Sequence, residues 1–439
     1  MSAPPEHSRT QLRRAVTSSY LGSVIEYYDF LLYATASAVV FNKVFFPNID
    51  PTIGAIASFG TLATGYLARP VGAAIFGHYG DRIGRKQALI VTMSIMGVVS
   101  VLIGLLPGYA SIGIWAPILL VFLRIMQGIA IGGEWGGAVL ISAEHATSRR
   151  GLWAGFTLSG APSGMVLSTL ALTVVAALVG EPALIEWGWR IPFLLSAVLL
   201  VIGLFVRSRV EETPAFRQET ERSTLPLMDV LRNNPRTLLL SIGVGLGAFV
   251  AQGTLTVFVI SYAVGAGFAR PQVLNALTIS SVVAAVAILI FANLSDRIGR
   301  RPVVTVGAIA MGVWAFAIFP LIDTKSFVLL TVAVVVGQGI THPAMYGPMA
   351  ALYAELFSTR VRYTGASLGY QIAGIGAGIA PLVFASLGAA TGSSVVVSVV
   401  IAACCLLTVA CVRITGETSQ NQLGEAVGDV TTDGARIKP

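Results

Sequence analysis

Two carboxylates lie one helical turn apart inside an apolar stretch near the amino terminus. The stretch SVIEYYDFLLYATASAVVF, residues 23–41, is apolar enough to cross a membrane as a helix, yet it contains Glu26 and Asp29. Their spacing puts both side chains on one helix face, which Tyr33 continues. Charged side chains at bilayer depth cost at least about 2.5–3.5 kcal/mol each on insertion scales, so they normally face a cavity and mark a pathway.

An arginine in a later apolar stretch is expected at the depth of these carboxylates. With a rise of about 1.5 Å per residue, Glu26 and Asp29 lie roughly 16 and 21 Å from one membrane face. Arg124 lies about nine residues from the opposite end of its stretch, near the same level. Two acids beside one cation cannot all be ionised at low cost in a low dielectric. One acid is thus predicted to carry a proton while the other pairs with Arg124; a fixed structural ion pair is the alternative.

Other polar residues within the apolar stretches are candidates for the same pathway. Glu134 lies ten residues, about 15 Å, from Arg124, so we expect it at a gate or proton exit rather than in the same site. His342 either relays protons or is a hydrogen-bonded structural residue. Arg69 is expected to extend its side chain to the membrane surface. Uncharged groups suit the orientation of a ligand or hold helices together; they are Gln127, Gln252, Gln338, Tyr346 and Gln371.

The sequence that positions these residues is that of an integral membrane protein. Of its 439 residues 55% are hydrophobic and 11% charged, whereas soluble domains carry roughly 25% charged residues. Twelve stretches are long enough to cross a bilayer core about 30 Å thick, so we expect an all-α membrane protein with twelve transmembrane helices. The expected spans are 15–41, 53–76, 88–106, 115–142, 151–179, 189–206, 237–265, 272–293, 302–321, 326–353, 362–388 and 393–413. In the helix over 115–142, the stripe of Gly128, Gly132 and Gly136 predicts close helix packing.

Basic residues lie mostly on alternate loops, which explains the net charge of +7 without a nucleic-acid partner. The positive-inside rule then predicts a multi-pass protein of the plasma membrane with both termini in the cytoplasm. The three cysteines fall in the last span without metal-ligand spacing, so no metal and no cofactor is expected. The expected segments are a cytoplasmic tail (1–14), a first six-helix bundle (15–206), a cytoplasmic linker (207–236), a second six-helix bundle (237–413) and a disordered cytoplasmic tail (414–439).

A short motif occurs twice, once in each half. GHYGDRIGRK, residues 77–86, and ANLSDRIGRR, residues 292–301, share DRIGR at an offset of 215 residues, which indicates an internal duplication. Glycines allow a tight turn and close helix approach, and Asp81 can lie at a helix N-terminus or beside a basic partner. We expect each copy of the motif to act as a latch that holds the two halves together. In the second copy Ala292 and Ser295 replace two glycines, so we expect a weaker latch there. The latch residues are Gly77, Gly80, Asp81, Arg82, Gly84, Arg85, Lys86, Asp296, Arg297, Gly299 and Arg300, with Arg82, Arg85 and Lys86 at the aqueous face.

The duplicated GxxxDRxGRK-type loop, the six plus six helices and the central linker resemble the major facilitator superfamily of secondary transporters over about residues 15–413. Five stretches also resemble its metabolite:proton symporter family: VIEYYDFLLYATAS, RIMQGIAIGGEWGGA, GWRIPF, RSRVEETPAF and AELFSTRVRYTGASLGYQ. Members of that family take up shikimate, dicarboxylates including 2-oxoglutarate, citrate, or proline and betaine. The resemblance implies two pseudo-symmetric bundles that alternate access, coupling at Glu26, Asp29 and Arg124, and a gate at Asp81.

The expected activity is therefore secondary transport by a non-enzyme, with a small organic acid and protons as partners and a monomer in the lipid bilayer as the working unit. A buried arginine favours a ligand with a carboxylate, so an acid of the shikimate or dicarboxylate kind is preferred. A proline or betaine importer is the near rival. A drug exporter is another, because SGAPSGMVLS, residues 159–168, shares part of an exporter signature. For a membrane enzyme or sensor, the sequence offers neither a metal-ligand cluster nor a phosphate loop.

Overall fold

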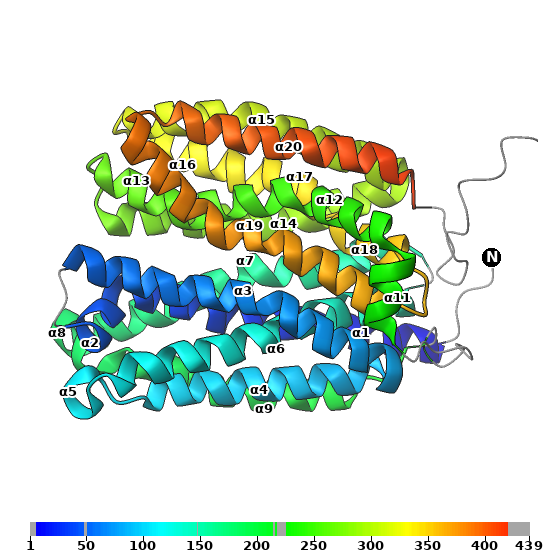
Figure 1. Ribbon diagram of the computed structural model, residues 1–439, viewed down its shortest axis with the longest axis horizontal. Coiled ribbons are helices and arrows are strands. Elements are labelled where there is room, and N and C mark those ends of the chain that lie inside the picture. The colour runs from blue at the N-terminus through cyan, green and yellow to red at the C-terminus, as the bar shows by residue number, and fades with distance from the viewer. Residues whose placement is uncertain (1–5, 48–50, 147, 214–215, 217–224, 420–439) are drawn as a thin grey trace, which may run out of the picture.

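The computed structural model describes residues 6–47, 51–146, 148–213, 216 and 225–419, and helices make up nearly all of these described residues (Figure 1). The first half contains α1 (Glu6–Ala36), η1 (Ser37–Phe41), α2 (Asn42–Phe45), α3 (Pro51–Ile83), α4 (Arg85–Leu105), α5 (Tyr109–Ile112), α6 (Trp115–His145), α7 (Arg150–Val179), α8 (Glu181–Ala183), η2 (Leu184–Gly188) and α9 (Arg190–Ser208). The second half contains α11 (Pro226–Asn233), α12 (Pro235–Gly253), η3 (Thr254–Phe258), α13 (Val259–Gly265), α14 (Arg270–Ile298), α15 (Arg300–Asp323), α16 (Phe327–Val334), η4 (Val335–Thr341), α17 (His342–Tyr346), α18 (Met349–Leu356), α19 (Arg362–Thr391) and α20 (Val395–Thr415). The π-helical turns η1 to η4 continue neighbouring helices without a break in the helical path.

The twelve expected spans each correspond to one helical segment, with a turn at Gly347 and Pro348 inside the tenth, and the predicted fold class is confirmed. Among the described residues, ten helical segments are long and apolar enough to cross a membrane. The helices α1 and α3, of 31 and 33 residues, complete the set of twelve. Both lie side by side with the other long helices of the first half (Figure 1).

The two halves pack as separate bundles that meet mainly along two helix pairs. Within the first half α1 packs on α7, α3 on α6, and α4 on α9; within the second, α12 packs on α19 and α20, and α15 on α20. Across the boundary α3 contacts α19, and α7 contacts α14. In Figure 1 the first half forms the lower layer and the second half the upper layer. Any pocket between the halves is therefore bounded by equivalent helices from both.

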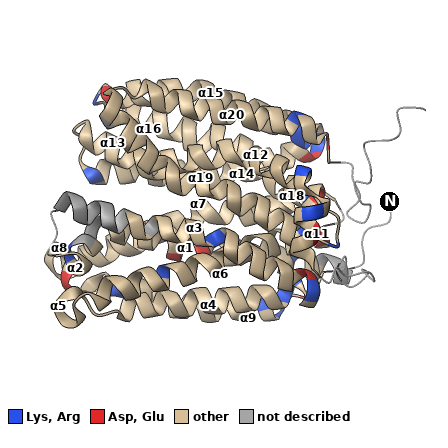
Figure 2. Cartoon of the chain, viewed as in Figure 1, with Lys and Arg blue, Asp and Glu red and all other residues tan. Residues whose placement is uncertain are grey.

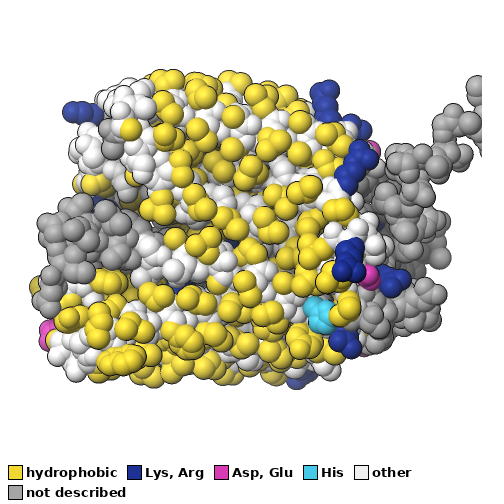
Figure 3. Space-filling view, viewed as in Figure 1, with side chains coloured by type: hydrophobic (Ala, Val, Ile, Leu, Met, Phe, Trp, Pro, Cys, Tyr) yellow, Lys and Arg dark blue, Asp and Glu magenta, His cyan; other side chains and the backbone are white. Residues whose placement is uncertain are grey.

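The surface has the polarity that a bilayer requires. Hydrophobic side chains cover the middle of the visible face, while Lys and Arg gather mainly at one end (Figure 3). Exposed large apolar residues include Val201, Leu239 and Val313. Charged residues also lie midway along α1, α3 and α6, whereas the middle of the second half carries none in this view (Figure 2). The charges that this view shows midway along the helices thus lie in the first half.

The duplicated motif forms a corner between two helices rather than an extended loop. We expected the spans 53–76 and 272–293 to end before it, but α3 continues to Ile83 and α14 to Ile298. A single residue, Gly84 or Gly299, then separates each helix from the next. Their φ angles of 115° and 100° lie in the left-handed region that glycine adopts at little cost. We call the end of the molecule that carries both corners the motif end, and the opposite end the far end.

The glycine stripe of α6 packs closely on other helices, as the sequence predicts: Gly128 and Gly132 face α3, and Gly136 faces Ser367 of α19. A Cβ at Gly128 would lie 2.3 Å from the carbonyl oxygen of Gly65, and one at Gly132 would lie 2.0 Å from that of Arg69. On the opposing helix, a Cβ at Gly72 would lie 1.9 Å from the carbonyl oxygen of Ile129. The backbones of α3 and α6 therefore touch directly, which is how membrane helices gain packing energy.

Gly72→Ala will lower the midpoint of thermal unfolding in detergent by several degrees. The added methyl group meets backbone that cannot move aside, and overpacking of this kind costs about 1–3 kcal/mol. Gly388→Ala is the matched control, because a Cβ at that helical position meets nothing within 4 Å. Equal midpoints for the two variants would contradict the close packing of α3 on α6.

Candidate functional site

A pocket lies between the two halves. The first half contributes residues from α1, α3 and α7, and the second half contributes residues from α12, η3, α14, η4 and α17. Four of the predicted residues line it: Gln252, Gln338, His342 and Tyr346. The wall from the first half, which we had not predicted, is formed by Tyr27, Phe30, Leu31, Tyr66, Ala161, Pro162 and Met165. The pocket is mostly apolar with a few polar groups, as small-molecule sites usually are.

The polar groups of the pocket differ in how they are already engaged. Gln338 accepts a hydrogen bond from Ser280 at 3.2 Å and donates one to Ser281 at 3.3 Å. His342 stacks on Tyr346 with ring centroids 5.0 Å apart, and its Nε2 has no hydrogen-bond partner among the described residues. Gln252 is half-buried, and no hydrogen bond of its side chain is found in the described part of the chain. Gln252 and His342 are thus the groups best placed to meet a ligand.

Gln252→Leu will raise the KM for the transported substrate roughly two- to tenfold, because one neutral hydrogen bond contributes about 0.5–1.5 kcal/mol. Initial rates of uptake into proteoliposomes give the KM. Gln272→Leu is the control, since Gln272 lies at the start of α14, where its side chain accepts from the backbone of Ala269. An unchanged KM for Gln252→Leu would remove this residue from the binding surface.

Aromatic side chains close the pocket on the side of the motif end. The hydroxyl groups of Tyr346 and Tyr370 are hydrogen-bonded. The indole of Trp135, from the first half, stacks on Tyr370 with centroids 3.5 Å apart. Gln371, another predicted site residue, does not line the pocket; its amide donates to the carbonyl oxygens of Ile131 and Gly132. These contacts join α6 to α17 and α19 and form a floor across the boundary between the halves.

On the other side the pocket continues toward the far end. A second hollow shares Leu31, Met165 and Thr256 with it and extends to Arg270, where α14 begins. The path from the pocket therefore leads away from the motif end. A ligand entering from the far end could reach Gln252 and His342 without passing the aromatic floor.

Arg124 and Asp29 do not pair with each other, which corrects the expected geometry. Arg124 is fully buried, and its Nη1 donates to Gln127 at 2.5 Å, which in turn donates to Ser100 at 2.9 Å. Asp29 is also fully buried and accepts a hydrogen bond from Ser196 of α9. No carboxylate of the described residues lies within ion-pairing distance of Arg124.

Aromatic rings occupy the place that we expected a carboxylate to take beside Arg124. Its guanidinium carbon lies 4.1 Å from the ring centroid of Phe30 and 4.1 Å from that of Tyr33. The hydroxyl of Tyr33 donates to Thr61 at 2.7 Å. Such cation–π contacts contribute about 0.5–2 kcal/mol each, so Arg124 is held by the first half alone.

Glu26 and Glu134 belong to a different cluster. Glu134 forms an ion pair with Arg207 of α9, and Arg207 also donates to the carbonyl oxygen of Leu89 at 2.9 Å. Glu26 is buried within electrostatic range of Glu134 and Arg207, but its Oε2 has no partner among the described residues. We placed Arg207 in the predicted linker 207–236, yet its side chain is buried inside the first half. Glu26 therefore lies between the pocket and this cluster without an ion pair of its own.

Arg69 is buried as well, and the expectation that it reaches the membrane surface is wrong. Its side chain is 3% exposed, and its guanidinium carbon lies 4.3 Å from the ring centroids of both Phe30 and Tyr66. Proline follows it within α3, and the helix continues for 13 residues beyond that proline. Arg69 thus points into the first half, toward the rings that line the pocket.

The first latch joins α3 and α4 to the start of α19. We define it as Asp81, Arg85, Glu144 and Arg362. The carboxylate of Asp81 accepts from the backbone N–H groups of Tyr363 and Thr364 at 3.2 and 3.0 Å. It therefore occupies the N-terminus of a helix of the other half, where the helix dipole favours an anion.

Buried ion pairs complete the first latch. Glu144 lies 3.5 Å from Arg85 and 3.0 Å from Arg362. Arg85 is only 1% exposed, so our placement of it at the aqueous face is wrong, whereas Arg82 is exposed. Gly77 and Gly80 lie within α3 and permit the approach of α19, since a Cβ at Gly80 would lie 2.0 Å from the ring of Tyr363. The glycines of the motif thus serve helix packing, and Gly84 alone makes the turn.

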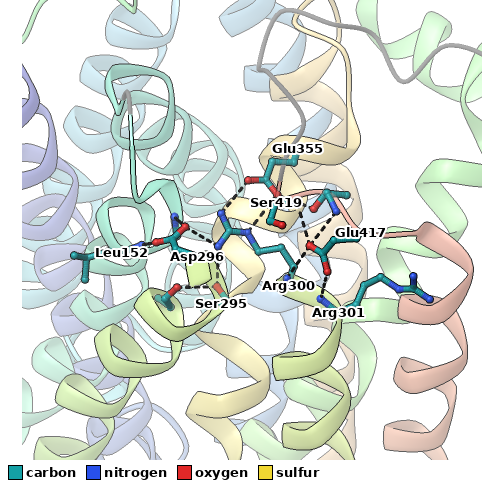
Figure 4. Close-up of polar contacts among 11 residues, drawn as sticks. Leu152, Ser295, Asp296, Arg300, Arg301, Glu355, Glu417 and Ser419 are labelled. Carbon is teal, nitrogen blue, oxygen red and sulfur yellow. Dashed lines mark hydrogen bonds and ion pairs between the residues drawn. The ribbon is translucent and has the colours of Figure 1, made fainter. Parts of the chain in front are cut away.

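The second latch repeats this arrangement with the halves exchanged (Figure 4). We define it as Asp296, Arg300, Glu355 and Glu417. Asp296 accepts from the backbone N–H groups of Gly151 and Leu152 at 2.8 and 2.9 Å, at the start of α7. Arg300 pairs with Asp296 at 2.7 Å and with Glu355 at 3.0 Å. The ion pairs of Arg300 are shorter than those of Arg85, so the geometry gives no support for a weaker second latch. Arg297 is exposed, as Arg82 is in the first copy of the motif.

A carboxylate after the last helix of each half covers the corner of the motif. Glu417 accepts from the backbone N–H groups of Arg300 and Arg301, and Glu212 accepts from that of Lys86 at 3.1 Å. Burial opposes ionisation of Glu417, but the N–H donors of Arg300, Ser419 and Arg301 outweigh it and lower the pKa of this carboxyl. The sequence holds a signal for this feature that we did not use: Glu-Thr follows the sixth helix of both halves, at 212–213 and 417–418.

Comparison with known proteins decides the family. The model of the Major Facilitator Superfamily matches residues 30–280 and 259–430. The chain belongs to the major facilitator superfamily. It is 37% identical over 388 residues to the shikimate transporter of Escherichia coli (strain K12), with 87% of this chain and 89% of that protein covered. It is also 37% identical to the inner membrane metabolite transport protein YhjE of the same strain, over 95% of this chain and 97% of that one.

Two further similarities of this superfamily member extend the comparison. A proline/betaine transporter of Salmonella typhimurium (strain LT2) is 34% identical, with 86% of this chain and 78% of that protein covered. A solved structure of the proton:xylose symporter XylE has a TM-score of 0.75 at 17% identity, covering 94% of this chain and 97% of that one. The relatives match the expected family, and the structure matches the expected fold. The protein is a multi-pass membrane transporter of this superfamily and not an enzyme.

Proposed function

We propose that this transporter takes up a small organic acid together with protons by alternating access, with the motif end in the cytoplasm. The observation that carries the proposal is the pocket between the halves, closed toward the motif end by the aromatic floor and two latches and continued toward the far end. In a transporter of two bundles, breaking the latches and rocking the halves would open the same pocket to the other side.

Proton coupling is supported by the two carboxyls of α1. Glu26 and Asp29 are buried, each has one oxygen without a hydrogen-bond partner, and neither forms an ion pair with a described residue. A charged carboxylate in such surroundings is costly unless it binds a proton or a cation. We therefore assign proton binding to these two residues, with Glu134 and Arg207 as a further step toward the motif end. Arg124 is held by Gln127 and by the rings of Phe30 and Tyr33, and it supports Phe30 in the wall of the pocket.

An organic acid is favoured over the other substrates by what surrounds the pocket. Two buried arginines, Arg69 and Arg124, lie behind Phe30 and lack an ion-pair partner among the described residues. A cationic wall suits a ligand that carries a carboxylate. The related shikimate and metabolite transporters agree with that class. The related proline/betaine transporter keeps a zwitterion with a carboxylate as the second candidate.

The experiment that tests this function is a recording of external pH in weakly buffered, de-energised cells that express the protein. Shikimate, 2-oxoglutarate, citrate, succinate, proline, betaine and benzoate are added in turn. Alkalinisation that depends on expression identifies a substrate and inward proton symport together. Alkalinisation with betaine or proline alone would replace the acid by a zwitterion, and silence for all seven would contradict the proposal and direct attention to export.

A further inference from the structure

Arg69 is a buried cation with an unused donor edge. It lies inside α3 and is 3% exposed, and its Nε and Nη2 atoms have no hydrogen-bond partner within the described residues. These two atoms form the side of the guanidinium that binds both oxygens of a carboxylate in the bidentate geometry. A buried donor left unpaired costs free energy. The unpaired edge is therefore expected to gain a partner at some stage of the transport cycle.

Arg69 differs from Arg124 in the space around that edge. Arg124 also lacks partners at Nε and Nη2, but its Nε lies against the backbone of α3, since a Cβ at Gly65 would be only 2.7 Å from it. Its Nη1 is already bound to Gln127. The guanidinium of Arg69 instead rests between the side chains of Phe30 and Tyr66. Side chains can rotate, whereas a packed helix backbone cannot move aside.

Phe30 and Tyr66 are also the wall between Arg69 and the pocket. Both line the pocket, and their rings meet edge to face with centroids 4.9 Å apart. The cation–π contacts that hold them to Arg69 give Nε and Nη2 no acceptor, whereas a carboxylate would accept from both atoms in a bidentate ion pair. Rotation of these two rings is the smallest movement that would bring the Arg69 edge to the pocket surface.

We propose that Arg69 binds the carboxylate of the substrate, which replaces Phe30 and Tyr66 as the partner of its guanidinium. The proposal rests on the proposed function in that it requires a substrate with a carboxylate in this pocket. Glu26 lies within electrostatic range of Arg69 without pairing with it, so it does not already neutralise this cation. The expected ligand is any small molecule that carries a carboxylate, whether an acid or a zwitterion.

The test compares wild type, Arg69→Gln, Arg69→Lys and the control Arg413→Gln in proteoliposomes, with the seven compounds named above as probes. Arg413 is exposed at the end of α20, far along the chain from the pocket residues. For each compound that wild type takes up, Arg69→Gln is expected to raise KM at least about tenfold, because charge-assisted hydrogen bonds are lost. Arg69→Lys keeps the positive charge but lacks the two parallel N–H donors of the guanidinium, so its KM should lie between those of wild type and Arg69→Gln.

A second probe, the methyl ester of the transported compound, distinguishes binding of the carboxylate by Arg69 from a purely structural role of this residue. The ester lacks the carboxylate, so its inhibition constant should be the same in wild type and in Arg69→Gln if Arg69 contacts that group. Equal loss of affinity for acid and ester, or an unchanged KM for the acid, would overturn the role of Arg69 while leaving the proposed function intact. If Arg69→Gln does not fold, Arg69→Lys replaces it in the test, with the same comparison of the KM for the acid and the inhibition constant of the ester. A wild type that takes up none of the compounds would overturn the proposed function and this inference with it.

Discussion

Asp29→Asn and Glu26→Gln will each abolish accumulation of the substrate against a gradient while leaving its exchange across the membrane intact. Symport of one proton per molecule lets a pH difference of one unit support about a tenfold accumulation. Both carboxyls are buried, lack an ion-pair partner among the described residues and lie on the helix that lines the pocket. An amide cannot release a proton, so the variants should equilibrate the substrate to a ratio of about one.

Proteoliposomes with an imposed pH difference measure accumulation, and counterflow of labelled substrate measures exchange. Glu186→Gln is the control, because Glu186 is an exposed carboxylate of η2 at the far end. Loss of counterflow together with accumulation would indicate a damaged fold rather than lost coupling. Unchanged proton-driven accumulation in both variants would remove Glu26 and Asp29 from the coupling role.

Arg300→Met will open the motif end. The substitution leaves Asp296 and Glu355 without their shared cation in a buried site, and breaking a buried pair from one side costs about 3–5 kcal/mol. If the latch exists only in the closed state, the ratio of closed to open molecules should fall by about two to four orders of magnitude. Uptake should become slow, because the far-end-open state that accepts substrate is depopulated.

Spin labels at positions 208 and 413, the ends of α9 and α20, report this change by pulsed electron resonance in a background without the three native cysteines. Arg301→Met is the control, since Arg301 is the neighbouring cation and its side chain donates to the carbonyl oxygen of Arg413 rather than to a carboxylate. A distance distribution for Arg300→Met that matches wild type and this control would contradict the role of the second latch.

The helices and the latch motif could be predicted because their signals are local. Apolar length identifies each span, and the repeated DRIGR identifies equivalent corners of the two halves. For Asp81 the motif predicted a helix N-terminus or a basic partner, and the structure has both, the start of α19 and Arg85. The spacing of the glycines in α6 likewise predicted close helix packing, but the partner helices, α3 and α19, are known only from the structure.

The partners of the buried charges could not be predicted, because depth along a helix does not fix direction around it. Arg124 and Asp29 lie at similar depth but turn to Gln127 and to Ser196, which is 167 residues from Asp29 in sequence. Arg69 turns inward because Phe30 and Tyr66 offer it ring faces.

Arg207 shows the same limitation at a predicted boundary. Its position after an apolar stretch is typical of a loop, yet its ion pair with Glu134 draws it into the first half. Glycine at position 22 leaves room for it, since a Cβ there would lie 2.2 Å from its Nη2. The space between helices, which only the fold defines, decides these pairings.

The central claim is that the inward movement of an acid is driven by protons through the pocket between the halves. Its most direct test is the uptake of labelled substrate, as identified by the cell recordings, into proteoliposomes with a pH gradient imposed and then removed by a protonophore. We expect accumulation about tenfold per pH unit that collapses to equilibrium when the protonophore is added. Uptake that reaches the same equilibrium with and without the gradient would contradict the account and indicate facilitated diffusion.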